Sequence, residues 1–448
     1  MLRRSSAKVS IFLHTLLFLI VAASALNYWY VAEYAIKVSW NTYYYQKSSY
    51  ISLVPDWQKG LKDLFAFLLL IGSLWFPATT PNQDLIKNKD LTTCYALSIV
   101  VLGIAIARSI ASNFTLVMIF NSVRPFIHLV GLFVFCHRHL QPYYLRWVLE
   151  AINVLALIQV FYAYWQRQSA LQYNNIDLLN SGTARAVGTF IGPNTMALFL
   201  AIVFYINLSV LPQRKWRFLI LLLCGVGIFF SGSRTGLSLI LMLSIIASYR
   251  KINKVYINIS KNNLLNLLIT MPIISIIFIN IINNVNSISS RAFSSTTIDG
   301  RVDIFISLID RSDIWSLLFG HHLGYGSNIV QILSASSEKT LDNSTLFLSD
   351  STLAFLLGQF GVCGLLVVGI VIYILFQKMP KFIYTENPYL ALVFTGNLNK
   401  DKIGFLVCLI AILATIIIFE TYAVLPILTS ILFYFQMPDV LFNRNKLY

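Results

Sequence analysis

Long apolar runs recur along the whole chain and are separated by short polar segments. A run of about 18 or more apolar residues can cross the ~30 Å hydrocarbon core of a bilayer as an α-helix. Backbone N–H and C=O groups must be paired within such a segment, and the runs lack the alternation that is typical of membrane β-strands. The pattern therefore predicts twelve helical spans, at residues 10–30, 61–78, 93–111, 116–136, 143–163, 189–210, 217–232, 236–250, 264–283, 351–376, 404–418 and 421–437.

These spans predict an all-α, polytopic membrane protein with three regions in its 448 residues. Region 1–163 holds the first five spans. Region 164–376 holds the next five, together with two long loops at 164–188 and 284–350, the larger of which lies between spans nine and ten. Region 377–448 holds a polar loop and a C-terminal helical hairpin.

One further helix is expected inside the larger loop. From Arg301 to Leu318, apolar residues recur at close to helical spacing. Trp315, within this stretch, suits a position at the membrane interface.

Composition and charge support the same class. Hydrophobic residues make up 57% of the chain and charged residues 11%, whereas a soluble globular protein carries about 25% charged residues. The net charge of +15 lies in short loops between apolar runs, which is typical of membrane topology rather than nucleic-acid binding. The lysine and arginine bias predicts that both termini are cytoplasmic and that the loop 284–350 is outside.

The first residues have the features of a secretory signal, with Arg3, Arg4 and Lys8 before an apolar run that ends at Ala23-Ser24-Ala25. Because many spans follow, we expect an uncleaved first helix, with cleavage as the alternative. The five cysteines lack metal-ligand spacing and fall in or beside predicted spans, where free cysteine usually serves as an apolar residue. No nucleotide-binding loop or metal motif is visible, so neither metal nor cofactor is expected.

Three arginines lie within three residues of a glycine, in polar stretches at the predicted outer edges of spans: Arg185, Arg234 and Arg301. A guanidinium group is permanently charged, and its planar fork of donors matches phosphate oxygens. Together these residues predict a site for a lipid pyrophosphate headgroup at the outer face. In the alternative interpretation, Arg301 forms exposed pairs with Asp299 and Asp303, and Arg234 only extends from its turn to the interface.

Arg124 falls inside the fourth span, where a charge is costly and is usually functional or paired. Glu150 in the fifth span is its expected partner within the membrane. A structural ion pair and a substrate contact are both compatible with this placement.

His321 and His322 lie in FGHHLGYG (Phe319–Gly326), where the glycines predict a tight turn that allows close approach of backbone and substrate. Asp350 lies at the predicted start of span ten, in LSDST. In the simpler interpretation the histidines are solvated and Asp350 is a helix N-cap. In the functional one, these groups accept a proton from a sugar hydroxyl at the membrane face.

Four segments, in this order, resemble the O-antigen polymerase and ligase superfamily of bacterial inner membranes. RAVGTFIGPNTMALFL is similar to its R-x-x-G-T-F-x-x-P-N motif at the start of a span, and SGSRTGLSLIL to its S-x-S-R-[ST] hairpin turn. DGRVDIF followed by LFGHHLGYG is similar to its G-R…G-H-G-x-G pattern in the periplasmic loop, and SDSTLAFLLGQFGVCG to the segment that re-enters the membrane. The resemblance covers about residues 185–375, and the doubled histidine departs from the family's more usual single one.

The resemblance implies an inner-membrane glycosyltransferase that joins undecaprenyl-pyrophosphate-linked oligosaccharides at the periplasmic face. It implies that the three outer arginines, with Arg124 as a further candidate, bind the pyrophosphate, and that Asp350 or one of the two histidines accepts the proton. Ligases of the family typically carry histidine where span ten begins, so Asp350 favours the polymerase branch. The implied partners are the lipid-linked oligosaccharide and membrane lipids, with a flippase and a chain-length regulator as candidates and no nucleic acid.

Three alternatives remain open at this level. The first is the ligase of the same superfamily, which transfers finished glycan to lipid A core. The second is a transporter or flippase of lipid-linked sugars, for which repeated halves and broken midplane helices are expected and are not visible in the sequence. The third is a structural membrane partner, which has no need for arginines in glycine-rich outer loops.

Overall fold

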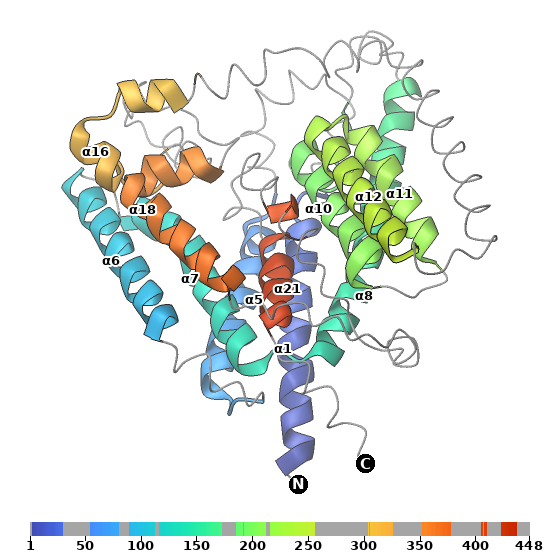
Figure 1. The fold of residues 1–448 in the computed structure, drawn as a ribbon, viewed down its shortest axis with the longest axis horizontal. Helices are drawn as coiled ribbons and strands as arrows, with labels where there is room; N and C mark the ends of the chain where they lie inside the picture. The colour runs from blue at the N-terminus through green and yellow to red at the C-terminus, as the bar shows by residue number, and fades with distance from the viewer. Residues whose placement is uncertain are drawn as a thin grey trace.

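The computed structural model describes the greater part of the chain, and every regular element among its described residues is a helix. Figure 1 shows these helices gathered into one bundle. The described residues are 2–29, 54–79, 89–112, 116–172, 185–190, 192–211, 216–255, 303, 305–325, 352–377, 405, 407–409 and 423–436.

The helices have the following bounds: α1 Leu2–Ala25, α5 Asp56–Trp75, α6 Lys89–Ala111, α7 Leu116–His139, α8 Pro142–Gln172, α10 Pro193–Tyr205, η1 Ile206–Val210, α11 Arg217–Ser231, α12 Arg234–Val255, α16 Ile314–Phe319, α18 Thr352–Gln377 and α21 Leu425–Gln436. The element η1 is a single π-helical turn that continues α10. Ten of the twelve predicted spans coincide with these helices. The predicted span 264–283 lies outside the described residues, and 404–418 is described only at 405 and 407–409.

Among the residues that the structure describes, five helices are long and apolar enough to cross a membrane, as expected of a helical membrane protein. They cover Ala7–Ala25, Ile119–His139, Pro142–Gln166, Pro193–Val210 and Leu353–Ile370. Four shorter apolar helices accompany them, at Ala96–Ala111, Arg217–Ser231, Arg234–Ser248 and Leu425–Tyr434. The total of twelve spans stays a prediction.

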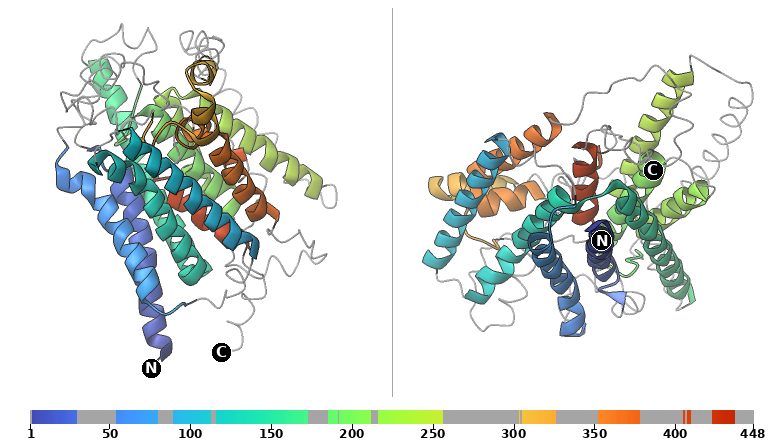
Figure 2. Two further views of the ribbon diagram at one scale, coloured as in Figure 1. Left: turned by 90° about the vertical axis from the view of Figure 1, so that its left-hand side faces the viewer. Right: turned by 90° about the horizontal axis from the view of Figure 1, so that it is seen from below.

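Neighbouring helices run up and down the bundle. Helix α1 packs against α5 and α8, α5 packs against α7, and α11 packs against α8 and α10. On the other side, α18 packs between α6 and α16. In Figure 1 and in the view from below in Figure 2, α6, α16 and α18 lie to one side of α21, whereas α11 and α12 lie to the other.

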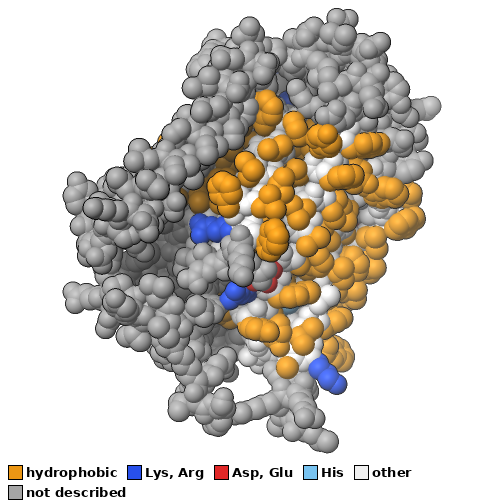
Figure 3. All heavy atoms as spheres, turned by 90° about the vertical axis from the view of Figure 1, so that its right-hand side faces the viewer, with side chains coloured by type: hydrophobic (Ala, Val, Ile, Leu, Met, Phe, Trp, Pro, Cys, Tyr) orange, Lys and Arg blue, Asp and Glu red, His pale blue; other side chains and the backbone are white. Residues whose placement is uncertain are grey.

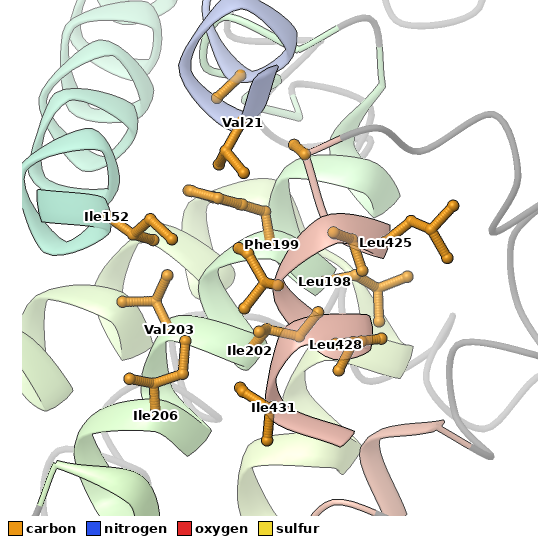
Figure 4. Close-up of a cluster of buried hydrophobic side chains, with 14 of the residues drawn as sticks. Val21, Ile152, Leu198, Phe199, Ile202, Val203, Ile206, Leu425, Leu428 and Ile431 are labelled. Atoms are coloured by element: carbon orange, nitrogen blue, oxygen red, sulfur yellow. The ribbon is translucent and has the colours of Figure 1, made fainter. Parts of the chain in front are cut away.

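The core is centred on α10, whose side chains are buried nearly all round. Figure 4 shows Leu198, Phe199, Ile202 and Val203 of this helix among side chains of three other helices. Those contributions are Val21 of α1, Ile152 of α8, and Leu425, Leu428 and Ile431 of α21. A helix that is apolar all round is typical of such a central position.

A reciprocal pair of amides fixes α8 against the end of this central segment. Asn207 donates to Asn153 Oδ1 at 2.7 Å, and Asn153 donates back to Asn207 Oδ1 at 3.4 Å. Both side chains are buried, and Asn207 also bonds to the Val203 carbonyl. Paired amides are the form in which such groups are tolerated among apolar helices.

Many large apolar side chains are exposed on the outside of the bundle. Figure 3 shows the side of the molecule on which α11 and α12 lie, where the described surface is mostly hydrophobic and only a few charged side chains interrupt it. Trp216, Phe218 and Ile245, for example, are each more than 60% exposed. An apolar patch of this extent needs an apolar environment, which a bilayer provides.

The helix expected from Arg301 to Leu318 is wrong as a single element. Residues 305–310 are helical, the chain turns at Arg311–Asp313, and α16 follows as a second short helix. The Ser312 hydroxyl bonds to the Leu308 carbonyl and ends the first helix, while the Asp313 carboxylate accepts from the Ser316 N–H and caps the second. The spacing of apolar residues does not reveal this break, because these residues recur at a similar spacing in the two helices.

Candidate functional site

The structure describes some of the predicted site residues but not all of them. Arg185, Arg234, Arg124 and the histidine pair are described, whereas Arg301 and Asp350 lie outside the described residues. Arg234 and the two histidines lie in two turns, Arg185 bonds to the first of these turns, and Arg124 lies inside α7. We name residues 231–236 the arginine turn and residues 319–325 the histidine turn.

The arginine turn is a tight link between two antiparallel helices. Helix α11 ends at Ser231, and Gly232 follows in the left-handed conformation with φ 59°, which favours glycine. Ser233 accepts from the Gly236 N–H through its hydroxyl and so caps α12, which begins at Arg234. Gly236 lets α12 approach closely, since a Cβ there would lie 2.9 Å from Ala197 Cβ. The SGSRTG spacing thus has a full local explanation.

Arg185 reaches this turn from a segment almost 50 residues away in the sequence. Its Nε donates to the Ser231 carbonyl at 2.8 Å, and its Nη2 donates to Asn194 Oδ1 at 2.9 Å. Next to it, the Ala186 N–H donates to the Phe230 carbonyl. The first two family-like segments therefore form one docked unit, with a fixed guanidinium group beside the start of α12.

Two buried glutamines of α8 hold the backbone that carries Arg185. Gln166 Oε1 accepts from the N–H groups of Val187 and Gly188, and its Nε2 donates to the Gly188 carbonyl. Gln159 accepts from the Thr189 N–H and donates to the Ala25 carbonyl of α1. The network satisfies the polar groups of a buried loop, which would otherwise cost several kcal/mol in lipid.

The histidine turn packs directly against a break in α18. Gly361, inside α18, has φ 64° and ψ −166°, a conformation that is essentially restricted to glycine. Gly320 faces this break with φ 82°, and a Cβ on it would lie 2.1 Å from the Gln359 carbonyl oxygen. The His321 N–H donates to the Gly358 carbonyl at 2.8 Å. The third and fourth family-like segments are therefore also a docked pair.

Helix α6 fixes the turn from the other side through its last two polar residues. Arg108 donates to the carbonyls of Trp315 and His321 at 3.2 and 3.1 Å and to the Ser316 hydroxyl at 2.9 Å. Ser109 accepts from the Leu323 N–H at 2.8 Å. The guanidinium group thus bonds to one carbonyl at the start of α16 and to another that follows the helix, so it joins α6 to both α16 and the histidine turn.

The two histidine rings share one aromatic neighbour. His321 stacks on Tyr325 with a centroid distance of 4.2 Å, and His322 meets the edge of the same ring at 5.3 Å. Burial is the main cause that lowers the pKa of both histidines, and the Arg108 charge adds to it. The pKa of His322 falls to about 4. Both rings are therefore neutral at physiological pH and able to accept a proton.

Arg124 does not pair with Glu150, so that expectation is wrong. Its Nη1 donates to Asp63 Oδ2 of α5 at 3.0 Å, and His128 Nε2 lies 3.6 Å from the other oxygen of the same carboxylate. Glu150 instead accepts from Arg146, one turn earlier on its own helix. Asp63 satisfies the need for a partner because α5 and α7 are direct neighbours. Arg124 is thus primarily part of an intramembrane ion pair.

Both turns lie at the same end of the bundle. The Gln159 and Thr189 contacts place the Arg185 segment at the Ala25 end of α1. The far end of α7 lies against the first half of α1, where His14 accepts from the Gln141 N–H. The start of α7 is therefore at the Ala25 end as well. The end of α6 is only five residues before it in the sequence, and Arg108 and Ser109 near that end bond to the histidine turn. The two turns flank α21 rather than touch (Figures 1 and 2).

Comparison with models of known protein families gives no match to this chain, and a comparison with curated proteins gives none either.

Sequence reasoning missed several residues that build these turns. Arg108 falls within the predicted span 93–111, but neither it nor Gln159, Gln166 or Ser312 was singled out as a site residue. Arg108, Gln159 and Gln166 bond to residues that are distant in the sequence, so no local pattern reveals their partners. Ser312 bonds to nearer residues, but only the fold brings its hydroxyl to the His321 ring. The only available signal was the cost of a charged or amide group in an apolar helix, which calls for a partner.

Proposed function

We propose that the protein is a polymerase of bacterial surface polysaccharide, which joins undecaprenyl-pyrophosphate-linked repeat units at the outer face of the plasma membrane. The observation that carries the proposal is the docking of the four family-like segments as two pairs at one end of the bundle. One pair presents arginine and the other presents neutral histidine. A lipid-linked sugar diphosphate requires this combination of an anion-binding group and a proton acceptor.

In the proposed reaction, a hydroxyl oxygen of the incoming repeat unit attacks the anomeric carbon of the growing glycan. The C–O bond to the pyrophosphate breaks, and its electron pair leaves with undecaprenyl pyrophosphate. A basic group of the protein accepts the hydroxyl proton. Arg185 and Arg234 offset the charge that develops on the leaving group. Arg301 joins them in this proposal on the strength of the family-like motif alone.

The polymerase is preferred to the ligase because aspartate, at position 350, precedes α18 where ligases of the family typically carry histidine. Ligase activity uses the same donor and differs in its acceptor. An experiment on the product therefore separates the two.

A flippase of lipid-linked sugars is the second candidate, and one observation favours it. Asp63, Arg124 and His128 form a charged cluster between α5 and α7, within the apolar part of the bundle. Ionisable groups in spans often line a transport pathway. The polymerase remains preferred because the direct Arg124–Asp63 hydrogen bond accounts for both charges without a substrate.

The test is deletion of the gene in its host, followed by analysis of the surface and lipid-linked glycans. A polymerase defect leaves single repeat units at the cell surface. A ligase defect leaves long polymer on its lipid carrier, and a flippase defect leaves single lipid-linked units that are inaccessible from outside. Polymerisation by the purified protein from lipid-linked units would complete the argument, whereas either of the other two patterns would overturn the proposal.

A further inference from the structure

The contacts around the histidine turn distinguish the two histidines, which the sequence alone leaves equivalent. We infer that His321 is the residue that accepts the hydroxyl proton, through its Nδ1 atom, and that Arg108 and Ser312 are positioning residues that hold its ring for this role. The inference rests on the function proposed above. It adds two residues outside the family-like motifs and selects one histidine of the pair.

The tautomer of His321 follows from the bonds of Ser312. The Ser312 hydroxyl lies 2.5 Å from the Leu308 carbonyl, which can only accept, so the hydroxyl proton is donated there. The same oxygen lies 2.9 Å from His321 Nε2 and must therefore accept from it. The neutral ring thus carries its proton on Nε2 and its lone pair on Nδ1. In the described part of the chain, no hydrogen bond uses that Nδ1 atom.

His322 has the opposite arrangement. Its Nδ1 lies 3.2 Å from the carbonyl of the next residue, Leu323, so Nδ1 carries the proton and donates. This leaves the His322 lone pair on Nε2, so the bonds alone would let either ring accept a proton. His322 is the weaker base, because burial lowers its pKa to about 4. His321, in contrast, is oriented through its far nitrogen by a side chain from another segment, as a general base is by its third group.

Arg108 fixes the backbone beneath the His321 ring. Its Nε donates to the His321 carbonyl, while the His321 N–H donates to Gly358 of α18, so the residue is held between two helices. The remaining donors of Arg108 hold α16 in place through Trp315 and Ser316. The ring position therefore depends on α6, which the motifs do not include.

The charge of Arg108 also acts on the ring. It lowers the pKa of His321, as burial does more strongly, and the Asp313 carboxylate at the start of α16 raises it. Helix α18, which packs against the turn from the other side, contains no charged residue. The neighbouring His322 ring is itself neutral. Arg108 and Asp313 are thus the two opposed charges whose removal shifts the His321 pKa in opposite directions.

The reaction step then has a defined proton path. The acceptor O–H bond breaks and its proton passes to His321 Nδ1, as the oxygen forms its bond to the anomeric carbon and the pyrophosphate departs with its electron pair. The positive ring retains its Nε2–H bond to Ser312. Activity requires the neutral ring, so the rate falls as the pH drops through the His321 pKa.

Two measurements on the full-length protein in lipid test the inference. The first is the pH dependence of the polymerisation rate. The second is the pH dependence of His321 carbethoxylation by diethyl pyrocarbonate, resolved from His322 by peptide fragmentation, which reports the pKa of the ring without any activity. The variants are Arg108→Gln and Asp313→Asn, where asparagine keeps the helix cap. The matched control is Arg311→Gln, which removes an exposed charge two residues from Asp313.

We expect Arg108→Gln to move both profiles to higher pH and Asp313→Asn to move both to lower pH, while Arg311→Gln moves neither. A merely structural role for Arg108 would lower the amplitude without moving the acid limb. His321→Ala should lose about 10²–10⁴-fold in rate, and Ser312→Ala roughly two- to tenfold. His322→Ala should retain most activity.

Near-normal polymerisation by His321→Ala, or rate profiles that stay in place while the carbethoxylation profiles move, would overturn the base role. If the carbethoxylation profile of His321 stays at the same pH in Arg108→Gln and Asp313→Asn, these two charges do not act on the His321 ring, and their role in positioning it is overturned. If the wild-type protein forms no polymer at any pH, the proposed function fails and the base role with it. Shifted carbethoxylation profiles would in that case still support the position of Arg108 and Asp313 beside the His321 ring.

Discussion

Replacement of Gly361 by alanine tests whether the histidine turn depends on the break in α18. At φ 64° and ψ −166°, a side chain is strained whatever space surrounds it. The added Cβ would lie 2.3 Å from the Leu318 carbonyl oxygen and 2.4 Å from its carbon. Because these are backbone atoms, no change of rotamer relieves the contact. Either α18 straightens or the turn moves away.

The free-energy cost of Gly361→Ala can be estimated from these two responses. The strained backbone costs about 1–3 kcal/mol, and moving the turn forfeits the His321–Gly358 and Gln359–Tyr325 hydrogen bonds, each worth about 0.5–1.5 kcal/mol. The sum is roughly 2–6 kcal/mol, or a factor of about 30 or more in the equilibrium between docked and undocked turn.

Gly369→Ala in the same helix is the matched control. No atom lies within 4 Å of its added Cβ, and the position is an ordinary helical one. Alanine is favoured over glycine there by up to about 1 kcal/mol. We therefore expect this variant to be as stable as the wild type, or slightly more so.

The assay combines thermal unfolding in detergent, followed by tryptophan fluorescence, with carbethoxylation of the histidine turn at neutral pH. We expect Gly361→Ala to lower the unfolding midpoint and to speed the modification of His321 and His322, and Gly369→Ala to do neither. Equal midpoints and equal modification rates in the two variants would refute the docking argument.

Four further predictions concern the charged groups, the topology and the metal requirement. Asp63→Asn leaves the Arg124 charge without its carboxylate partner and should cost about 3–5 kcal/mol of stability, whereas Asp63→Asn combined with Arg124→Gln should recover part of it. A double variant less stable than the single one would contradict the pairing. Arg185→Lys keeps the charge but loses the fork and should reduce polymerisation about ten- to a hundredfold; near-normal polymer length would exclude the arginine from diphosphate binding. A cysteine at Ser336 should react with an impermeant thiol reagent in intact spheroplasts, and labelling only after lysis would reverse the orientation. Because no ligand cluster is visible in the sequence, polymerisation should continue in excess EDTA, and a loss that magnesium restores would refute this.

Most of the helical architecture could be predicted because one physical requirement dominates it. Backbone groups in lipid must be bonded within their own segment, so apolar length translates directly into a helix. The run at 189–210 thus predicted the segment that α10 and η1 form, but not its central position, which depends on contacts with α1, α8 and α21. Hydropathy indicates only that the surface of a helix is apolar. Such a surface can face either lipid or other helices, so hydropathy does not distinguish a central helix from a peripheral one.

The candidate site, too, could be predicted from the sequence only in part. The short interval between spans 217–232 and 236–250 predicted a tight hairpin at SGSRTG, and the glycines of GHHLGYG predicted a tight turn; both segments contain glycine at positive φ. The partners of the charged residues could not be predicted, as Arg124 illustrates: Glu150 was the expected partner, yet Asp63 lies nearer because α5 packs on α7. Distances between helices depend on packing, and a single sequence does not encode packing in any local pattern.

The position of α21 has a consequence for biogenesis. This helix is the last described element of the chain, yet Leu425, Leu428 and Ile431 contribute to the same cluster as the central helix α10 (Figure 4). During synthesis, α10 leaves the ribosome more than 200 residues before its last neighbour does. Until then one flank of the central helix is open to lipid or to an insertion chaperone. A chain interrupted anywhere before residue 425 would therefore present an unfinished core to the quality-control proteases of the membrane.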